Sequence, residues 1–153
     1  MEFSTLLGFG YIIFASLSAQ LPHVLFRHYP KMTGSELAQK YPELAWLRFS
    51  YPILSVLWFL VWGGIPMFLM ITTTPFGAAE SFQSVIYVLG AAIGSVSILH
   101  GGLALLTRVC PLAHKRYRLY VYDDDMQPTA FLILALGVFV IVVAMAMIFF
   151  YVL

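Results

Sequence analysis

The stretch Phe131–Leu153, FLILALGVFVIVVAMAMIFFYVL, decides the fold class of this chain. It contains no charged residue and no strong hydrogen-bonding side chain before Tyr151. At about 1.5 Å per residue, a helix of this length crosses a hydrocarbon core of roughly 30 Å. Three further apolar stretches repeat the pattern, so the sequence predicts a polytopic membrane protein.

The composition of the chain agrees with a membrane location. Its 153 residues are 61% hydrophobic and only 10% charged, whereas about a quarter of the residues in soluble domains are charged. We therefore expect a single transmembrane domain over residues 1–153, all-α in class, built as a four-helix bundle with up-down connectivity. The predicted helices cover about residues 3–26, 45–71, 82–107 and 128–153.

Small residues recur along one face of several predicted helices. Because hydrophobicity does not drive helices together in lipid, small side chains that let backbones approach closely mark the protein-facing side. The third helix contains Gly90-x-x-x-Gly94 at the centre of such a stripe. We expect these stripes to contact other protein. The predicted packing residues are Gly8, Ala15, Gly90, Gly94, Ser97, Gly101 and Gly137.

Prolines predict two irregular positions in the helices. Pro22 lacks the amide hydrogen that would bond to the Ser18 carbonyl, so we expect it to bend or end the first helix and to leave that carbonyl free. In the second helix, Gly63, Gly64 and Pro66 weaken the backbone hydrogen bonds and predict a kink. Such a kink serves packing, or it acts as a hinge or as a break that lines a cavity.

The polar connections carry the orientation signal. All eight Lys and Arg residues flank the first and third connections, and none lies at the termini or in the second connection. The positive-inside rule then makes connections one and three cytoplasmic and puts both termini outside. We expect an integral protein of the plasma membrane, the inner membrane in a bacterium. Within the first connection, Thr33-Gly-Ser-Glu36 has the form of a capping box and predicts a short helix along the membrane surface.

Two histidines are candidate cofactor ligands. An ionisable side chain inside a membrane is costly, so it is by default a functional candidate. His23 ends the first helix and His100 lies near the cytoplasmic end of the third, and these two helices run parallel. Such a pair can ligate a b-type haem, with Gly94, Gly101 and Gly102 leaving room for the macrocycle. The alternative is a hydrogen-bonded or interfacial histidine pair.

Other chemistry finds little support in the sequence. Pairing His23 with His28, or His114 with the nearby aspartates, gives neither the spacing nor the number of ligands of a recognised metal site. The apolar parts of the second, third and fourth helices contain no acid, which disfavours catalysis and proton relay through carboxylates. We expect Cys110, the only cysteine, to be structural.

The stretch His114–Tyr122, HKRYRLYVY, combines basic and aromatic residues. It is suited either to holding anionic lipid headgroups or to docking a cytoplasmic protein. Three aspartates follow it directly, which argues against nucleic-acid binding. The candidate contacts for a partner or for headgroups are Arg27, Lys31, Lys115, Arg116, Arg118, Tyr117 and Tyr120.

The length, the four spans and the polar connections resemble those of the membrane-associated glutathione transferase and leukotriene synthase family. The resemblance implies a small transferase that loses turnover when Arg48 is replaced. That family has Arg, Asn and Glu where its second helix begins, whereas the stretch LAWLRFSYPILS here has Arg48 with neither Asn nor Glu. The likeness is therefore one of topology alone.

The expected function is non-enzymatic. We expect a small membrane subunit that homo-oligomerises or packs into a larger membrane complex, with cytoplasmic loops that dock a partner or the membrane surface. The alternative is a redox subunit that binds haem b or a quinone through His23 and His100.

Overall fold

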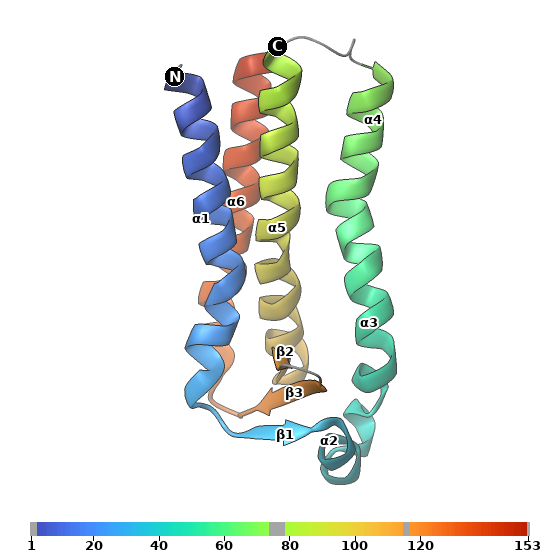
Figure 1. The fold of residues 1–153 in the computed structure, drawn as a ribbon. Helices are drawn as coiled ribbons and strands as arrows, with labels where there is room; N and C mark the ends of the chain where they lie inside the picture. The colour runs from blue at the N-terminus through green and yellow to red at the C-terminus, as the bar shows by residue number, and fades with distance from the viewer. Residues whose placement is uncertain (1–2, 74–78, 115–116, 153) are drawn as a thin grey trace.

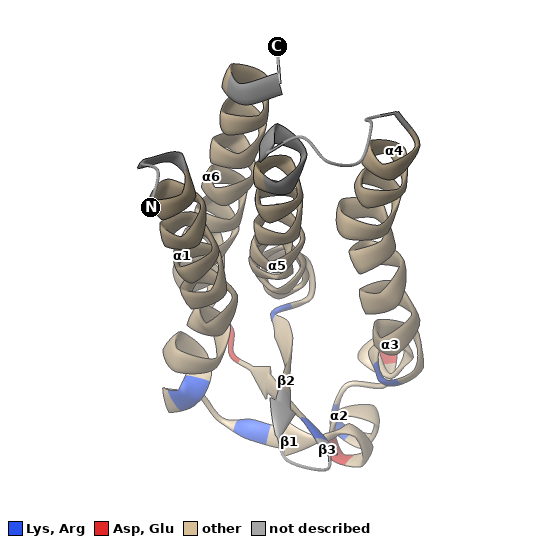
Figure 2. Cartoon of the chain, turned by 45° about the horizontal axis from the view of Figure 1, so that its top comes forward, with Lys and Arg blue, Asp and Glu red and all other residues tan. Residues whose placement is uncertain are grey.

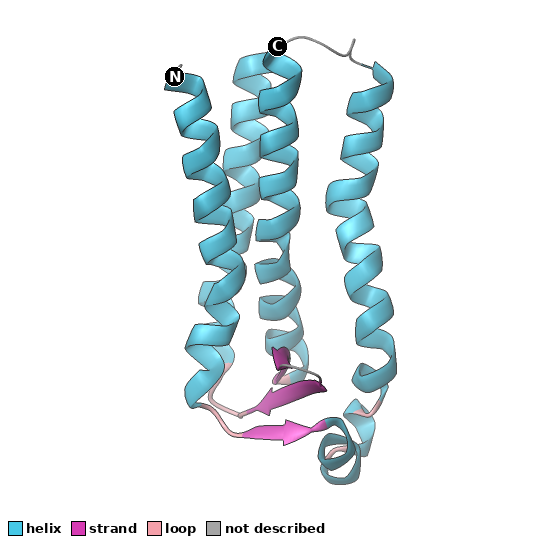
Figure 3. Cartoon of the chain, viewed as in Figure 1, coloured by secondary structure: helices cyan, strands magenta, loops and turns pink. Residues whose placement is uncertain are grey.

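Four helices long and apolar enough to cross a membrane make up most of the computed structural model, which describes residues 3–73, 79–114 and 117–152. They stand upright beside one another, with a small sheet across one end (Figures 1 and 3). The first long helix begins, and the last one ends, at the opposite end of the bundle (Figure 1). The four predicted membrane-length helices are thus confirmed. The long helices are α1 (Phe3–Leu25), α3 (Trp46–Phe59), which continues through η3 (Leu60–Gly64) into α4 (Ile65–Thr73), α5 (Ala79–Thr107) and α6 (Gln127–Val152).

The second span differs from the other three in its exposure. Within its most apolar window only 6% of the residues are buried, compared with 67% in α5 and 28% in each of α1 and α6. Three helices, α1, α5 and α6, therefore form a packed core with α5 at its centre. We call the remaining span, residues 46–73, the arm. Figure 1 shows the arm standing apart from α5.

A turn of π-helix, η3, joins the two halves of the arm at the predicted kink. Pro66 has no amide hydrogen to donate, and its ring clashes with a helical carbonyl four residues back. The Ile65 amide bonds to the carbonyl of Leu60, five residues earlier, which widens the turn. Gly63 also provides a contact, because a Cβ there would lie 3.0 Å from the Cβ of Ala92 on α5. Gly63, Gly64 and Pro66 therefore shape a wide turn that still touches the core.

The predicted packing residues contact one another's helices inside this single chain. A Cβ on Gly101 would lie 2.6 Å from the backbone nitrogen of Leu134. A Cβ on Gly137 would lie 2.8 Å from the backbone nitrogen of Ile98. The others are likewise covered: Gly8 by Ile86, Gly90 by Tyr11 and Gly94 by Val140, while Ala15 and Ser97 are fully buried. The stripes hold α1, α5 and α6 together, so they no longer point to a second subunit.

The carbonyl that Pro22 frees has found a partner on α5. Ser97 Oγ donates to the Ser18 carbonyl at 2.7 Å, and the Ser18 hydroxyl lies 3.0 Å from Ser97 Oγ. Tyr11 makes a similar bond to α6, because its hydroxyl donates to the Val140 carbonyl at 2.9 Å. Without water in a bilayer core, such bonds satisfy groups that would otherwise be costly.

A three-stranded antiparallel sheet caps the bundle, and the sequence patterns considered above do not predict it. Its strands are β1 (Lys31–Thr33), β2 (Val109–His114) and β3 (Tyr117–Tyr122), in the order β1-β3-β2. Met32 pairs with Tyr120, and Cys110 pairs with Val121. Cys110 is buried in this sheet, and burial raises the pKa of its thiol, which disfavours the reactive thiolate. We call this sheet together with α2 the cap.

Helix α2 (Gly34–Lys40) begins with the predicted capping box. The Glu36 amide donates to Thr33 Oγ1 at 3.3 Å, and the Thr33 amide donates to Glu36 Oε2 at 2.6 Å. Two short 3-10 turns, η1 (Phe26–His28) and η2 (Pro42–Leu44), connect the cap to α1 and to the arm.

The capping box gives α2 a pH dependence. Hydrogen bonds from the backbone and side chain of Thr33 hold the pKa of the Glu36 carboxyl below its ordinary value. A carboxyl group whose pKa is lower in the folded protein than in the unfolded chain stabilises the fold. This stabilisation is complete when the pH is above the ordinary pKa, and it is lost as the pH falls through the lowered pKa. We expect the protection factors of the α2 amides, which correct for the intrinsic exchange rate at each pH, to fall in acid, and Thr33→Val to lower them at neutral pH. Gln39→Ala is the control, and unchanged exchange in Thr33→Val would contradict the role of the box.

Candidate functional site

Three ring side chains from three helices meet at the sheet end of the spans. We call His23 on α1, Tyr51 on α3 and His100 on α5 the histidine–tyrosine cluster. The ring centroids of His23 and His100 are 6.5 Å apart, and those of Tyr51 and His100 are 5.9 Å apart. The structure therefore brings the two predicted histidines together, and it adds Tyr51, which the sequence does not single out.

Hydrogen bonds fix the proton on the His100 ring. Its Nδ1 lies 2.8 Å from the carbonyl oxygen of Val96, one turn back in α5. Because a carbonyl only accepts, Nδ1 carries the hydrogen. Nε2 then keeps a lone pair, and it accepts a hydrogen bond from the Tyr51 hydroxyl at 3.0 Å. Both ring nitrogens of this buried, neutral histidine thus have partners.

The surroundings of His100 favour a hydrogen-bonded histidine over a haem ligand, although its partners are Tyr51 and Val96 and not His23. Axial ligation needs a ring nitrogen of each histidine that is free to bind the iron, and both nitrogens of His100 are engaged. Gly94 and Gly101, expected to make room for a macrocycle, instead receive side-chain and backbone atoms of α6. One turn away, the bond between Ser97 and Ser18 brings α1 and α5 into contact. Among residues 3–73, 79–114 and 117–152, no three His, Cys, Asp or Glu side chains group as metal ligands.

The cluster extends from the core into the cap. The Arg118 guanidinium on β3 lies over the Tyr51 ring, with its Cζ 4.8 Å from the ring centroid, which is a cation–π geometry. Further along the arm, the Trp58 indole donates to the Ser95 carbonyl at 2.9 Å. Tyr51 and Trp58 therefore tie the arm to α5 by hydrogen bonds, and both bonds lie in its α3 half.

The cluster joins three helices through a hydrogen bond and ring contacts. It offers imidazole and phenol groups, and the sequences of α1, α3, α4 and α6 contain no Asp or Glu. The carboxylate on α5, Glu80, belongs to its first turn, at the end of that helix away from the cap. The described helices α1, α3, α4 and α6 therefore supply no carboxylate next to His100.

The basic residues gather at the sheet end, as Figure 2 shows for the described part of the chain. Arg27 follows α1, Lys31 begins β1, and Arg118 and Tyr120 lie on β3. Tyr120 is buried, which makes it part of the cap core rather than an open docking residue. Tyr117 begins β3, but its side chain lies outside the described part of the structure, as do the predicted contacts Lys115 and Arg116.

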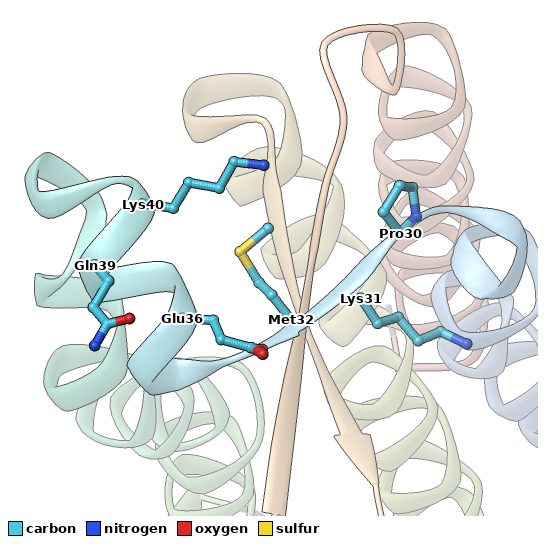
Figure 4. Close-up of a pocket in the computed structure, with 6 residues that line it drawn as sticks. All are labelled: Pro30, Lys31, Met32, Glu36, Gln39 and Lys40. Carbon is cyan, nitrogen blue, oxygen red and sulfur yellow. The ribbon is translucent and has the colours of Figure 1, made fainter.

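Two hollows on the surface differ in character. A hollow of about 510 Å³ lies between β1 and α2, where Lys40 reaches toward Met32 while Lys31 points away (Figure 4). Its carboxylate, Glu36, is already used by the capping box, so no set of polar groups converges there. The other, of about 610 Å³, is an apolar groove between α1 and α6 that includes Gly10, Phe14 and Phe139.

Comparison with known proteins identifies no relative that could inform these sites. No protein-family model matches the chain, and neither the curated proteins nor the solved structures searched contain a match. A function for this chain therefore has to be argued from its own residues.

Proposed function

We propose that this chain is a non-enzymatic integral membrane subunit whose arm binds a transmembrane segment of another subunit or of a second copy. The single observation that carries the proposal is the exposure of the arm. Only 6% of the residues in its most apolar window are buried, compared with 67% in the corresponding window of α5. The small-residue stripes are used inside the chain, so the arm is the span that offers most surface for assembly.

The η3–α4 half of the arm supports this assignment. Exposed apolar side chains surround it, among them Val61, Ile65 and Phe68. The indole N–H of Trp62 makes no hydrogen bond to any residue that the structure describes. Polar groups within a span bind neighbouring helices, because hydrocarbon offers them no partner. A second helix packed here would cover the apolar surface and supply an acceptor.

The charge distribution supports a cytoplasmic cap. The described basic residues lie at the sheet end, and the positive-inside rule places such a region in the cytoplasm, with both termini outside. A basic cap facing the inner leaflet would adjoin anionic lipids and soluble partners.

Mass measurement combined with site-specific crosslinking tests the proposal. A photoreactive residue at Ile65 should crosslink to a partner or second copy, whereas one at Phe139, an equally exposed position on α6, should crosslink much less. The native complex in lipid nanodiscs should then have a mass above that of one chain, and that mass distinguishes a homo-oligomer from a mixed complex. A protein that stays monomeric and without partners in native lipid would overturn the proposal.

The redox alternative keeps one supporting observation, the 6.5 Å approach of His23 to His100. An absorption spectrum of purified protein tests it, because a bound haem b gives a Soret band. We rank this alternative lower because both nitrogens of His100 are engaged.

A further inference from the structure

We propose that one anionic phospholipid binds where the arm meets the cap, with its phosphate held by Arg48 and Arg118 and its acyl chains along the exposed face of α3. The site is independent of the proposed subunit role, because it uses the opposite half of the arm from η3–α4. It also differs from general attraction to a basic surface, because it depends on two particular side chains.

The two arginines converge on one corner of the molecule. The Arg48 side chain lies against Gly34, where a Cβ would be 3.3 Å from Arg48 Cδ and 3.4 Å from a ring carbon of Tyr120. Arg118 lies two residues before Tyr120 on β3, so both side chains share one face of the strand. Arg118 stacks on Tyr51, which lies on α3 three residues after Arg48 and on the same face of the helix.

Each guanidinium is supported by an aromatic ring. The Cζ of Arg48 lies 5.5 Å from the centroid of Phe49, and that of Arg118 lies 4.8 Å from the centroid of Tyr51. Stacking of this kind covers the flat face of a guanidinium and leaves its N–H groups at the edge. Those N–H groups match the oxygens of a phosphate in a bidentate arrangement, which a lysine cannot reproduce.

No described carboxylate neutralises either arginine. The ion pair found among the described residues joins Arg108 to Asp124, at 2.7 Å. Glu36, the acid of the neighbouring helix α2, is bound to Thr33. Like charges on adjoining elements repel each other, and an anion bound between Arg48 and Arg118 would reduce that repulsion. The corner is therefore complementary to a negative charge.

An apolar helix face begins where the charge ends. Phe49, Ile53 and Val56 follow one another at intervals of four and three residues, which places them on one side of α3. All three are more than half exposed, and Phe49 is 71% exposed. The span lies in the membrane, so a ligand that fits both parts needs a phosphate and hydrocarbon chains together. A phospholipid has this chemistry, whereas free phosphate lacks the apolar part.

Native mass spectrometry of the full chain with defined lipids tests the site. We expect one phosphatidylglycerol to stay bound where phosphatidylcholine does not, and Arg48→Gln or Arg118→Gln to weaken this retention about tenfold. Arg48→Lys should also weaken lipid retention, because lysine keeps the positive charge but cannot make the bidentate hydrogen bonds of a guanidinium group. Lys40→Gln, which removes an exposed charge at the same end of the molecule, should leave retention within about twofold of the wild type.

Each other outcome overturns the proposal. Equal losses in Lys40→Gln and Arg48→Gln would show general attraction of the basic end to anionic lipid. Displacement of the lipid by millimolar inorganic phosphate would assign the corner to a soluble anion instead. Loss in Arg48→Gln without loss in Arg118→Gln would remove the paired site. Circular dichroism and thermal unfolding of each variant confirm that the fold is intact, and Arg48→Lys remains informative if Arg48→Gln does not fold.

Discussion

Replacing Gly101 with alanine is expected to destabilise the protein by about 3 kcal/mol, against a gain of about 1 kcal/mol in helix propensity. The added Cβ would lie 2.6 Å from the Leu134 nitrogen and 2.8 Å from the Ala130 carbonyl oxygen. Both are backbone atoms of α6, so no side chain can rotate away, and α5 and α6 must separate. Thermal unfolding in mild detergent measures the loss, which should appear as a much lower midpoint.

Gly10 provides the matched control. A Cβ at Gly10 meets nothing within 4 Å, so Gly10→Ala should leave stability unchanged or raise it by up to about 1 kcal/mol. Similar unfolding midpoints for Gly101→Ala and Gly10→Ala would show that α5 and α6 are not packed as closely as described.

Replacing His100 with alanine is the second change expected to have a large effect, also about 3 kcal/mol. It leaves a cavity beside α5, and it removes the acceptor of the Tyr51 hydroxyl, which is buried. Tyr51→Phe should cost about 1–3 kcal/mol, because Nε2 of His100 then stays buried without a donor. Both changes remove the hydrogen bond that ties the arm to α5 near the cap. Crosslinking efficiency between cysteines placed in α3 and α5 should fall along with the unfolding midpoint.

His28 is the control for this change, because it is exposed and lies outside the cluster. His28→Ala should alter stability by less than about 0.5 kcal/mol. Equal midpoints for His28→Ala and His100→Ala would contradict the network. If the wild-type protein shows a Soret band that His100→Ala abolishes, the redox alternative gains support over the hydrogen-bond network of His100.

The helices were predictable because their signals are local. A run such as Phe131–Leu153 has only one stable form in hydrocarbon, and the capping box of Thr33 and Glu36 lies within four residues. The sheet was not predictable in this way. Its pairing joins Thr33 to Leu119 across two spans, and basic residues within β3 conceal the alternation of a strand.

The candidate site was predictable in part for the same reason. His23 and His100 stand out because ionisable groups are rare in apolar spans, and parallel helices bring them to one depth. Tyr51 gives a weaker signal, since a tyrosine near a membrane surface is common. The sequence could not show that the stripes of Gly94 and Gly101 make contacts within the chain. Small residues indicate close helix packing, but they do not reveal which helix is the partner.

The pairing of β1 with β3 also constrains how the protein is made. A ribosome adds about 5–20 residues per second, so β1 leaves it on the order of ten seconds before β3. During that interval the second and third spans enter the bilayer. The backbone N–H and C=O groups of β1 that will bond to β3 have no strand partner in this period. The cap therefore closes only after α5 has been inserted, and its completion reports that the first three spans have reached their final arrangement.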